Sequence, residues 1–205
     1  MPSKCCTGVV LAGGASARFS GALKGLLPLG DRRIVDRVLD ALGTSCDDLL
    51  VVANDPAIGH ALPGVPVHGD ARPERGSLIG LYSGVSHVRH GALVVAWDMP
   101  FVSPELLREL REIGEAHAVA VLPEGPRGPE PLYAYYPASS ATVIQRQIAS
   151  GILRLGALVD VLPGRVVLPL DAVARFGDPE QLFVNVNTPH DLERAEEMLH
   201  SEQQR

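Results

Sequence analysis

The amino-acid sequence predicts an α/β fold in which a mostly parallel β-sheet is covered by helices on both faces. Short apolar segments typical of buried strands alternate with segments of helical periodicity along most of the 205 residues. Strands and helices that alternate in this way usually build one parallel sheet. The length suffices for one full core, whereas two separate domains would be cramped. We therefore expect residues 1–205 to form a single domain.

Composition and charge exclude several classes of protein. The formal net charge is −6, whereas general nucleic-acid-binding proteins usually carry a basic face. No apolar run approaches the roughly 20 residues that cross a bilayer, and the start MPSKCCTGVV lacks the apolar core of a signal peptide. The spacing of Cys5, Cys6 and Cys46 does not match a zinc site, so we expect reduced thiols. The composition predicts a cytoplasmic protein that binds neither nucleic acid nor membrane.

In the first half of the chain, strands and helices are expected in strict alternation. Residues 31–42 place apolar side chains on one helical face, and Gly43 stops that helix. Pro104 begins an amphipathic helix over 104–113, with Ser103 as its N-cap. The remaining patterns predict strands at 7–11, 49–53, 65–70 and 93–96, and helices at 55–62 and 77–90.

The second half continues the alternation with more turns. Its patterns predict a helix at 138–149 and strands at 118–122, 132–136 and 165–170. Residues 123–131, PEGPRGPEP, are too rich in proline and glycine for regular structure; they could form a mobile lid or a plain surface loop. Residues 182–199 predict a strand, a turn and a helix, with Thr188 as N-cap, Pro189 next and Asp191 at the third helical position.

The glycine-rich loop after the first predicted strand favours phosphate binding. Gly13, Gly14 and Gly21 surround the two cations Arg18 and Lys24. Glycines allow backbone N–H groups to approach an anion, and the two cations add positive charge. The loop fits neither the Walker pattern nor G-x-G-x-x-G. An ordinary strand-to-helix connection with two surface cations is the alternative.

Polar residues directly after other predicted strands are expected at the same sheet edge. In open α/β sheets, ligands bind outside the carboxyl ends of the strands. Asp98 follows the apolar run ALVVAW, and Asp70 and the Asn185–Asn187 turn also follow predicted strands. A carboxylate such as Asp98 can hold Mg²⁺ together with substrate phosphates. Alternatively, Asp98 merely caps a turn.

Four segments together resemble one enzyme family. LAGGASARFSGALKGLLPL is similar to the signature L-A-G-G-x-S-x-R-(apolar)-G-x-x-K-x-L-L-x-L of the molybdenum cofactor guanylyltransferases (molybdopterin-guanine dinucleotide biosynthesis protein A). WDMPFVSPELL resembles the family's D-x-P-(aromatic) segment, and FVNVNTPHDL resembles N-x-N-T-P-E-D-L. SGILRLGAL resembles a further block, with Arg154 at its basic position. The segments follow the family order and span nearly the whole chain.

The resemblance implies a Rossmann-like three-layer sandwich of the nucleotide-diphospho-sugar transferase type. It implies transfer of GMP from Mg-GTP to the terminal phosphate of molybdopterin, with Mg²⁺ at Asp98 and Mn²⁺ as a substitute. The nucleotide-binding half would reach to about residue 115, and the acceptor-binding half would cover about 116–205. Nucleotide-binding residues would be Leu11, Ala12, Gly13, Gly14, Arg18, Lys24, Asn54, Asp70 and Gly80. Catalytic residues would be Lys24, Arg18 and Asp98, and acceptor-binding residues would be Arg154, Asn185 and Asn187.

The implied mechanism needs no strong general base. The nucleophile would be a phosphate monoester whose second pKa is about 6, so it is largely ionised already. None of the seven histidines lies in a convincing base motif. Catalysis would be positioning and charge neutralisation by Lys24, Arg18 and the metal.

Two departures from the family pattern leave alternatives open. Ser77 stands where the family usually has proline, and Glu130 stands where histidine is common. These departures support a non-catalytic nucleotide-binding accessory protein as one alternative. A related enzyme with another base or acceptor, such as a cytidylyl- or sugar-phosphate nucleotidyltransferase, is the other. The implied partners are GTP and molybdopterin, with transient contact to proteins that deliver molybdopterin or mature molybdoenzymes. A monomer or a small homo-oligomer is expected.

Overall fold

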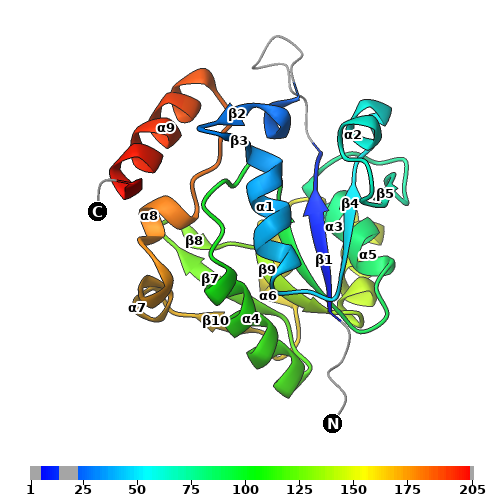
Figure 1. Ribbon diagram of the computed structural model, residues 1–205. Coiled ribbons are helices and arrows are strands. Elements are labelled where there is room, and N and C mark those ends of the chain that lie inside the picture. The colour runs from blue at the N-terminus through cyan, green and yellow to red at the C-terminus, as the bar shows by residue number, and fades with distance from the viewer. Residues whose placement is uncertain (1–5, 14–22, 204–205) are drawn as a thin grey trace.

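The computed structural model describes residues 6–13 and 23–203 and is built around one central sheet (Figure 1). Its strands are β1 (Cys6–Leu11), β4 (Asp48–Val52), β5 (Val67–His68), β6 (Gly91–Ala96), β7 (Val121–Gly125), β8 (Gly128–Pro129), β9 (Tyr133–Pro137) and β10 (Val166–Leu168). They lie in the order β10–β7–β9–β6–β1–β4–β5, and β8 pairs with β7.

Most neighbouring strands of the sheet are parallel, as predicted. β1 pairs in parallel with β4 and with β6, β4 with β5, and β7 with β10. β9 is antiparallel to both β6 and β7. The short connection from β7 through β8 to β9 explains this exception, because a parallel crossover needs a dozen or more residues.

Helices cover both faces of the sheet, which completes the predicted sandwich. They are α1 (Ile34–Gly43), α2 (Pro56–Ala61), α3 (Ser77–Ser86), α4 (Pro104–His117), α5 (Ser140–Ala149), α6 (Gly156–Val161), α7 (Leu170–Val173), α8 (Pro179–Leu182) and α9 (Pro189–Gln203). On one face, Val10 and Val95 pack with buried residues of α1 and α4. On the other face, Val9 and Val94 pack with buried residues of α3 and α5. Adjacent strand residues therefore serve opposite cores, as expected for a sheet buried on both sides.

The helix predicted over 31–42 begins later than its apolar pattern suggests. Arg32–Arg33 forms β3, which pairs antiparallel with β2 (Pro28–Leu29). Gly30 makes the turn between them with φ of 64°, a left-handed conformation that favours glycine. This hairpin competes successfully with the first turn of the predicted helix, which therefore starts at Ile34.

Two strand predictions in the second half need correction. Ala118 ends α4 with φ of 54°, so the strand predicted at 118–122 starts only at Val121 and reaches into 123–131, where β8 pairs with it as a hairpin. The strand predicted at the start of 182–199 is wrong. Leu182 ends α8, and residues 183–187 run to α9 without joining a described strand.

The C-terminal helix α9 packs against the β2–β3 hairpin and the first residue of α1. Ala195 and Leu199 of α9 form a small buried cluster with Leu29, Ile34 and Val186. This contact holds the segment before α9 against the β2–β3 hairpin, and Figure 1 shows α9 beside that hairpin. The described residues contain no helix with the length and hydropathy of a membrane span.

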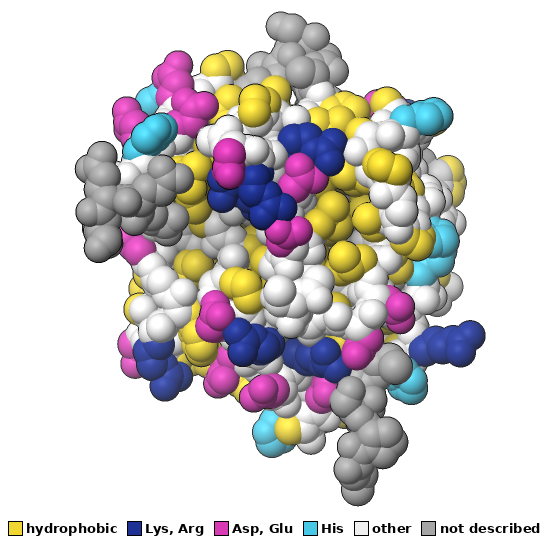
Figure 2. Space-filling model, viewed as in Figure 1, with side chains coloured by type: hydrophobic (Ala, Val, Ile, Leu, Met, Phe, Trp, Pro, Cys, Tyr) yellow, Lys and Arg dark blue, Asp and Glu magenta, His cyan; other side chains and the backbone are white. Residues whose placement is uncertain are grey.

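Charges on the face seen in Figure 2 are mixed rather than separated by sign. Ion pairs also join opposite charges locally: Arg33, just before α1, is bound to Asp36, and Arg111 of α4 is bound to Glu115. The intermixed charges provide no extended basic surface on this face.

The lack of a side chain at Gly25 allows the segment that carries Lys24 to lie directly against the Trp97 ring in the core. It lies in a short 3₁₀ helix (Lys24–Leu26), and a Cβ on Gly25 would overlap with the ring of Trp97, which is 2% exposed. Overpacking of a core typically costs about 1–3 kcal/mol, and each kcal/mol lowers the melting temperature of a chain this size by about 2–4 °C. We expect Gly25→Ala to lower the melting temperature by several degrees, measured by differential scanning fluorimetry.

Gly59→Ala is the matched control for this prediction. Gly59 lies within α2, and the atom nearest to a Cβ added there would be Val67 Cγ2 at 4.0 Å, an ordinary van der Waals distance. Removing a glycine from a helix interior typically stabilises a protein by about 0.5–1 kcal/mol. Equal melting temperatures for the two variants would show that the Trp97 ring does not restrict Gly25.

Candidate functional site

The carboxyl ends of β1, β4 and β6 bring three loops together. Leu11, the last residue of β1, is in register with Val52 of β4 and with Ala96 of β6. The Trp97 N–H donates to the Leu11 carbonyl at 3.2 Å, and the Ala12 N–H donates to the Val52 carbonyl at 2.9 Å. The residues after these strands therefore start from one fixed edge, as predicted for parallel neighbours.

Lys24, Asp98 and Asn187 meet at this edge from three distant parts of the chain. The Lys24 Nζ donates to Asp98 Oδ2 at 2.5 Å and to Asn187 Oδ1 at 2.7 Å. The side chains of Lys24 and Asp98 are only 13% and 9% exposed. An ion pair with so little exposure is weakly screened by solvent and salt. The cluster therefore presents a fixed positive charge beside a carboxylate and an amide.

The position of Asn187 is fixed by the start of α9. Asp191 Oδ2 accepts from the Asn187 N–H at 3.0 Å and from the Thr188 N–H at 2.7 Å, while Thr188 Oγ1 accepts from the Asp191 N–H at 3.2 Å. This reciprocal cap confirms the predicted N-cap at Thr188. Burial disfavours the charged form of Asp191, but the hydrogen bonds from Thr188 and Asn187 outweigh it and lower its pKa. The Val186 N–H also donates to the Asp98 carbonyl at 2.8 Å, which ties the segment directly to the end of β6.

A second polar pair lies on the β4 and β5 side of the cluster. The Asn54 Nδ2 donates to Asp70 Oδ2 at 2.6 Å, and the Asp70 N–H donates to Asn54 Oδ1 at 2.8 Å. A Cβ on Gly80, in the first turns of α3, would lie 3.9 Å from Asp70 Oδ1 and from Leu11 Cδ2. The structure thus places Asn54, Asp70, Gly80 and Leu11 together. Asp70 is half-buried and keeps a carboxylate oxygen beside this glycine.

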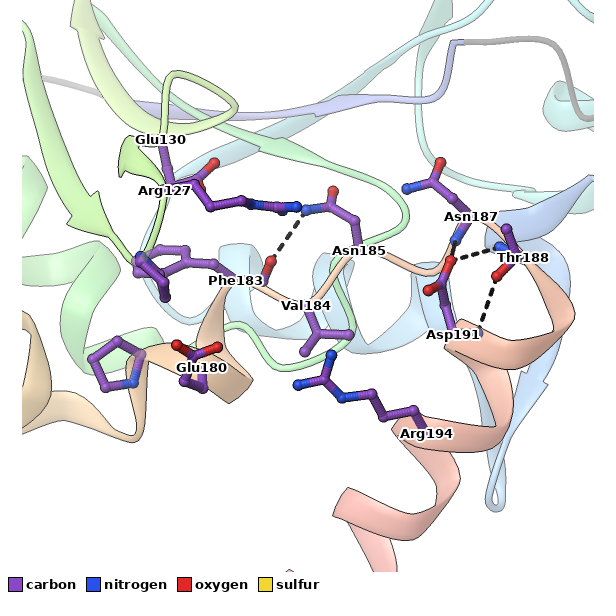
Figure 3. A pocket seen from close by; sticks show the side chains of 12 residues that line it. Arg127, Glu130, Glu180, Phe183, Val184, Asn185, Asn187, Thr188, Asp191 and Arg194 are labelled. Carbon is purple, nitrogen blue, oxygen red and sulfur yellow. Dashed lines mark hydrogen bonds between the residues drawn. The ribbon is translucent and has the colours of Figure 1, made fainter.

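A cavity of about 620 Å³ opens on the other side of the cluster. It lies between the β7–β8 hairpin, α8 and the start of α9, and its lining includes Arg127, Glu130, Glu180, Asn185, Asn187 and Arg194 (Figure 3). Its size is in the range of ordinary small-molecule sites. Asn187 belongs both to the cavity wall and to the Lys24–Asp98 cluster, so the two are continuous.

Not every candidate residue joins the cluster or the cavity. Arg154 lies between α5 and α6 with an exposed side chain, and its carbonyl accepts from Gln147 Nε2 at 3.0 Å. No hydrogen bond or ion pair joins its side chain to the candidate residues that the structure describes. Gly14 and Arg18 lie outside the described residues. Gly13 is exposed, and a Cβ there would meet nothing within 4 Å.

Sequence reasoning missed several residues of the cavity. Arg127, Glu180 and Arg194 lie in its wall, although none belongs to a motif that the sequence analysis singled out for binding. Arg127 lies in the segment predicted to be irregular, and Arg194 lies on a helix with a polar face. On the hairpin side of the wall, only the unusual Glu130 gave a sequence signal.

The oxygen atoms around Lys24 fit a divalent cation. Asp98 Oδ2 and Asn187 Oδ1 converge on one positive charge, the Lys24 ammonium, and carboxylate and amide oxygens are the ligands that hard cations prefer. Among the described residues, no group of three or more histidine, cysteine or acidic side chains could hold a metal. A cation at Asp98 would therefore take most of its ligands from bound phosphates and water.

Comparison with known proteins agrees with this geometry. Residues 8–159 match the family described as MobA-like NTP transferase domain. A protein from Desulfosudis oleivorans named molybdenum cofactor guanylyltransferase is 34% identical over 192 residues, which cover 93% of this chain and 94% of that protein. One from Cereibacter sphaeroides with the same name is 34% identical over 197 residues, covering 94% and 96%.

A solved structure is similar over nearly the same extent. The crystal structure of molybdopterin-guanine dinucleotide biosynthesis protein A from Archaeoglobus fulgidus is 31% identical to this chain, with a TM-score of 0.81. The match covers 95% of this chain and 99% of that one. The similarity therefore includes the C-terminal segment that carries Asn185 and Asn187.

Proposed function

The chain belongs to the MobA-like NTP transferase family, and we propose that it transfers GMP from GTP to the terminal phosphate of molybdopterin. The observation that carries the proposal is the meeting of Lys24, Asp98 and Asn187 at the sheet edge, between a polar pair and a cavity. In the proposed reaction a bond forms between the α-phosphorus of GTP and an oxygen of the acceptor phosphate. The bond from the α-phosphorus to the bridging oxygen breaks, and pyrophosphate leaves.

The nucleotide would bind on the β4 and β5 side. Backbone groups of Leu11, Ala12 and Gly13 would contact it, and Asn54 would orient Asp70 through their two hydrogen bonds. The Asp70 carboxylate would accept from the N1–H and 2-amino donors of guanine beside Gly80. Gly14 and Arg18 would add phosphate contacts.

Lys24 and Asp98 would act on the α-phosphate from the middle of the site. The Lys24 ammonium is already desolvated and would neutralise charge that develops in the transition state. NTP transferases of this kind use a divalent metal ion, and Asp98 would hold it, as Mg²⁺ or Mn²⁺. When bound, that ion would supply further neutralisation of the phosphate oxygens. The acceptor phosphate is ionised near neutral pH, so no side chain has to remove its proton.

The acceptor would occupy the cavity on the far side of Asp98. Asn185 and Asn187 line it and would orient the acceptor phosphate towards Lys24. The exposed Arg154 would contribute positive charge from the α5–α6 connection. In this arrangement residues up to about 115 supply the nucleotide side and later residues the acceptor side of one cytoplasmic domain. Proteins that deliver molybdopterin or mature molybdoenzymes would make only transient contact.

Nucleotide-dependent stabilisation tests the donor half of the proposal. A ligand present at 100 times its dissociation constant adds about 2.7 kcal/mol of stability, and each kcal/mol is worth about 2–4 °C for a chain of this size. We expect GTP with Mg²⁺ to raise the melting temperature by about 5–10 °C, with little shift from CTP, ATP or UTP. Asp70→Asn should lose this preference for GTP.

The assay also separates the alternatives. A shift with CTP alone would favour a cytidylyltransferase. A shift with GTP but no pyrophosphate release in the presence of molybdopterin would favour a non-catalytic accessory protein. No shift with any nucleotide would contradict the assignment of the glycine-rich loop to phosphate binding.

A further inference from the structure

Glu130 places an unpaired carboxylate in the cavity wall. Its side chain lies over Gly125, where an added Cβ would be 2.8 Å from Glu130 Cγ and 2.9 Å from Oε1. Among the described residues, the carboxylate makes no hydrogen bond or ion pair. Burial raises the pKa of Glu130, and the nearby charge of Arg127 only partly opposes the shift. Such a group gains from a ligand that donates hydrogen bonds to it.

The walls beside Glu130 suit a flat ring. Phe183 lies in the lining with Pro126 and Pro179, and its ring is held edge-to-face against Tyr133, with ring centroids 5.4 Å apart. In Figure 3 the side chain of Arg127 extends from the hairpin towards Asn185, on the way to Asn187. The cavity thus offers apolar surface and a carboxylate at the hairpin and polar groups towards Lys24.

Asp70 and Glu130 lie on opposite sides of Asp98 along the sheet edge. Asp98 follows β6, in the middle of the sheet, whereas Asp70 follows β5 and Glu130 follows the β7–β8 hairpin. In the sheet order, β4 and β5 lie on one side of β1 and β6, while β9 and β7 lie on the other. A reaction that joins two phosphates at Asp98 would therefore extend one substrate towards Asp70 and the other towards Glu130.

We propose that Glu130 is a specificity-determining residue that accepts hydrogen bonds from the N3–H and 2-amino groups of a pterin ring. The inference rests on the proposed function, which places the acceptor in this cavity. A 2-amino-4-oxo ring presents these two donors side by side, and a carboxylate can accept both. A ring with oxygen in place of the 2-amino group would face the carboxylate with an acceptor, and the pair would repel.

Fluorescence titration with two small probes tests the proposal without any transfer reaction. The probes are 6-hydroxymethylpterin phosphate and its lumazine analogue, in which an oxygen replaces the 2-amino group. The wild-type protein should prefer the pterin by on the order of 10- to 100-fold, which corresponds to the loss of one or two charge-assisted hydrogen bonds. Glu130→Gln should remove most of this preference, because an amide can pair with the lumazine oxygen.

Two further variants sharpen the test. Glu180→Gln makes the same change of charge in the same cavity lining, and it should keep the preference for pterin. Gly125→Ala should displace the Glu130 side chain and reduce the preference as Glu130→Gln does. A preference lost equally in Glu180→Gln and Glu130→Gln would overturn the proposal, because it would reflect cavity charge rather than one carboxylate.

Guanine presents the same pair of hydrogen-bond donors as a pterin ring, so the dissociation constant of GTP is measured as well. Glu130→Gln should leave the dissociation constant of GTP unchanged, and a rise of tenfold or more would assign Glu130 to the donor and overturn the proposal. Absence of pterin binding, or an unchanged preference in Glu130→Gln, would also overturn it. Transfer of GMP to molybdopterin by the wild-type protein would still uphold the proposed function, so the two proposals fail separately.

Discussion

Asp98→Asn is expected to lower kcat for GMP transfer by about 10²–10³-fold, the loss typical for removal of one electrostatic group from an active site. The substitution keeps the shape of the side chain and the backbone bond from the Val186 N–H to the residue 98 carbonyl. It removes the one carboxylate that contacts Lys24 in the described part of the chain. We expect the concentration of Mg²⁺ needed for half-maximal activity to rise, measured by pyrophosphate release.

Two controls accompany Asp98→Asn, a measurement of its stability and the variant Asp160→Asn at a distant aspartate. The Lys24 ammonium would lose its counter-charge but keep Asn187 Oδ1, so we expect a loss of about 1–3 kcal/mol of stability. Assays well below the melting temperature separate this loss from the catalytic effect. Asp160→Asn changes an exposed aspartate and should leave kcat unchanged. Full activity of Asp98→Asn would exclude Asp98 from the metal site and from catalysis.

The pattern of the sequence predicts most of the fold, because its strands are buried on both faces. Runs such as 49–53 and 93–96 carry apolar side chains on both faces of a strand. The structure places β4 and β6 there, with boundaries shifted by one or two residues. The prediction failed at 182–186. The apolar residues of that segment are typical of a buried strand. Leu182, Phe183 and Val186 are buried, but by packing against helices and loops rather than by hydrogen-bonded pairing with a described strand. Local pattern does not distinguish these two ways of burying the same residues.

The candidate site was also predictable in part, because strand order places some of its residues. Lys24 and Asp98 follow strands that neighbour each other in a parallel sheet, so their approach follows from topology. Asn187 lies 163 residues from Lys24 in the sequence, and the strand that was predicted to bring it to the sheet edge does not form among the described residues. Its position depends on the cap at Asp191 and on the packing of α9 against Leu29 and Ile34. Such long-range packing is not visible in the spacing of any motif, and neither are Arg127 and Arg194.

Lys24→Met is expected to lower kcat by about 10²–10³-fold, like Asp98→Asn, but to have the opposite effect on metal binding. Methionine has a similar length and no charge, so the variant removes the ammonium from its position 2.5 Å from Asp98 Oδ2. In the free protein this ammonium competes with a metal ion for the same carboxylate oxygen. Without it, Asp98 loses its counter-charge, and a divalent cation becomes the best available partner for a buried carboxylate.

Mn²⁺ titration of the nucleotide-free protein, followed by electron paramagnetic resonance, measures this effect. Lys24→Met should bind Mn²⁺ more tightly than the wild type, and Asp98→Asn should bind it more weakly. Lys24→Arg keeps a positive charge, although its larger planar group fits the position less well, and it should not tighten the binding of Mn²⁺. Weaker Mn²⁺ binding in Lys24→Met would mean that the ammonium supports the metal site rather than competing for it. The opposite signs expected for Lys24→Met and Asp98→Asn therefore separate the two roles, which the similar loss in kcat alone would leave indistinguishable.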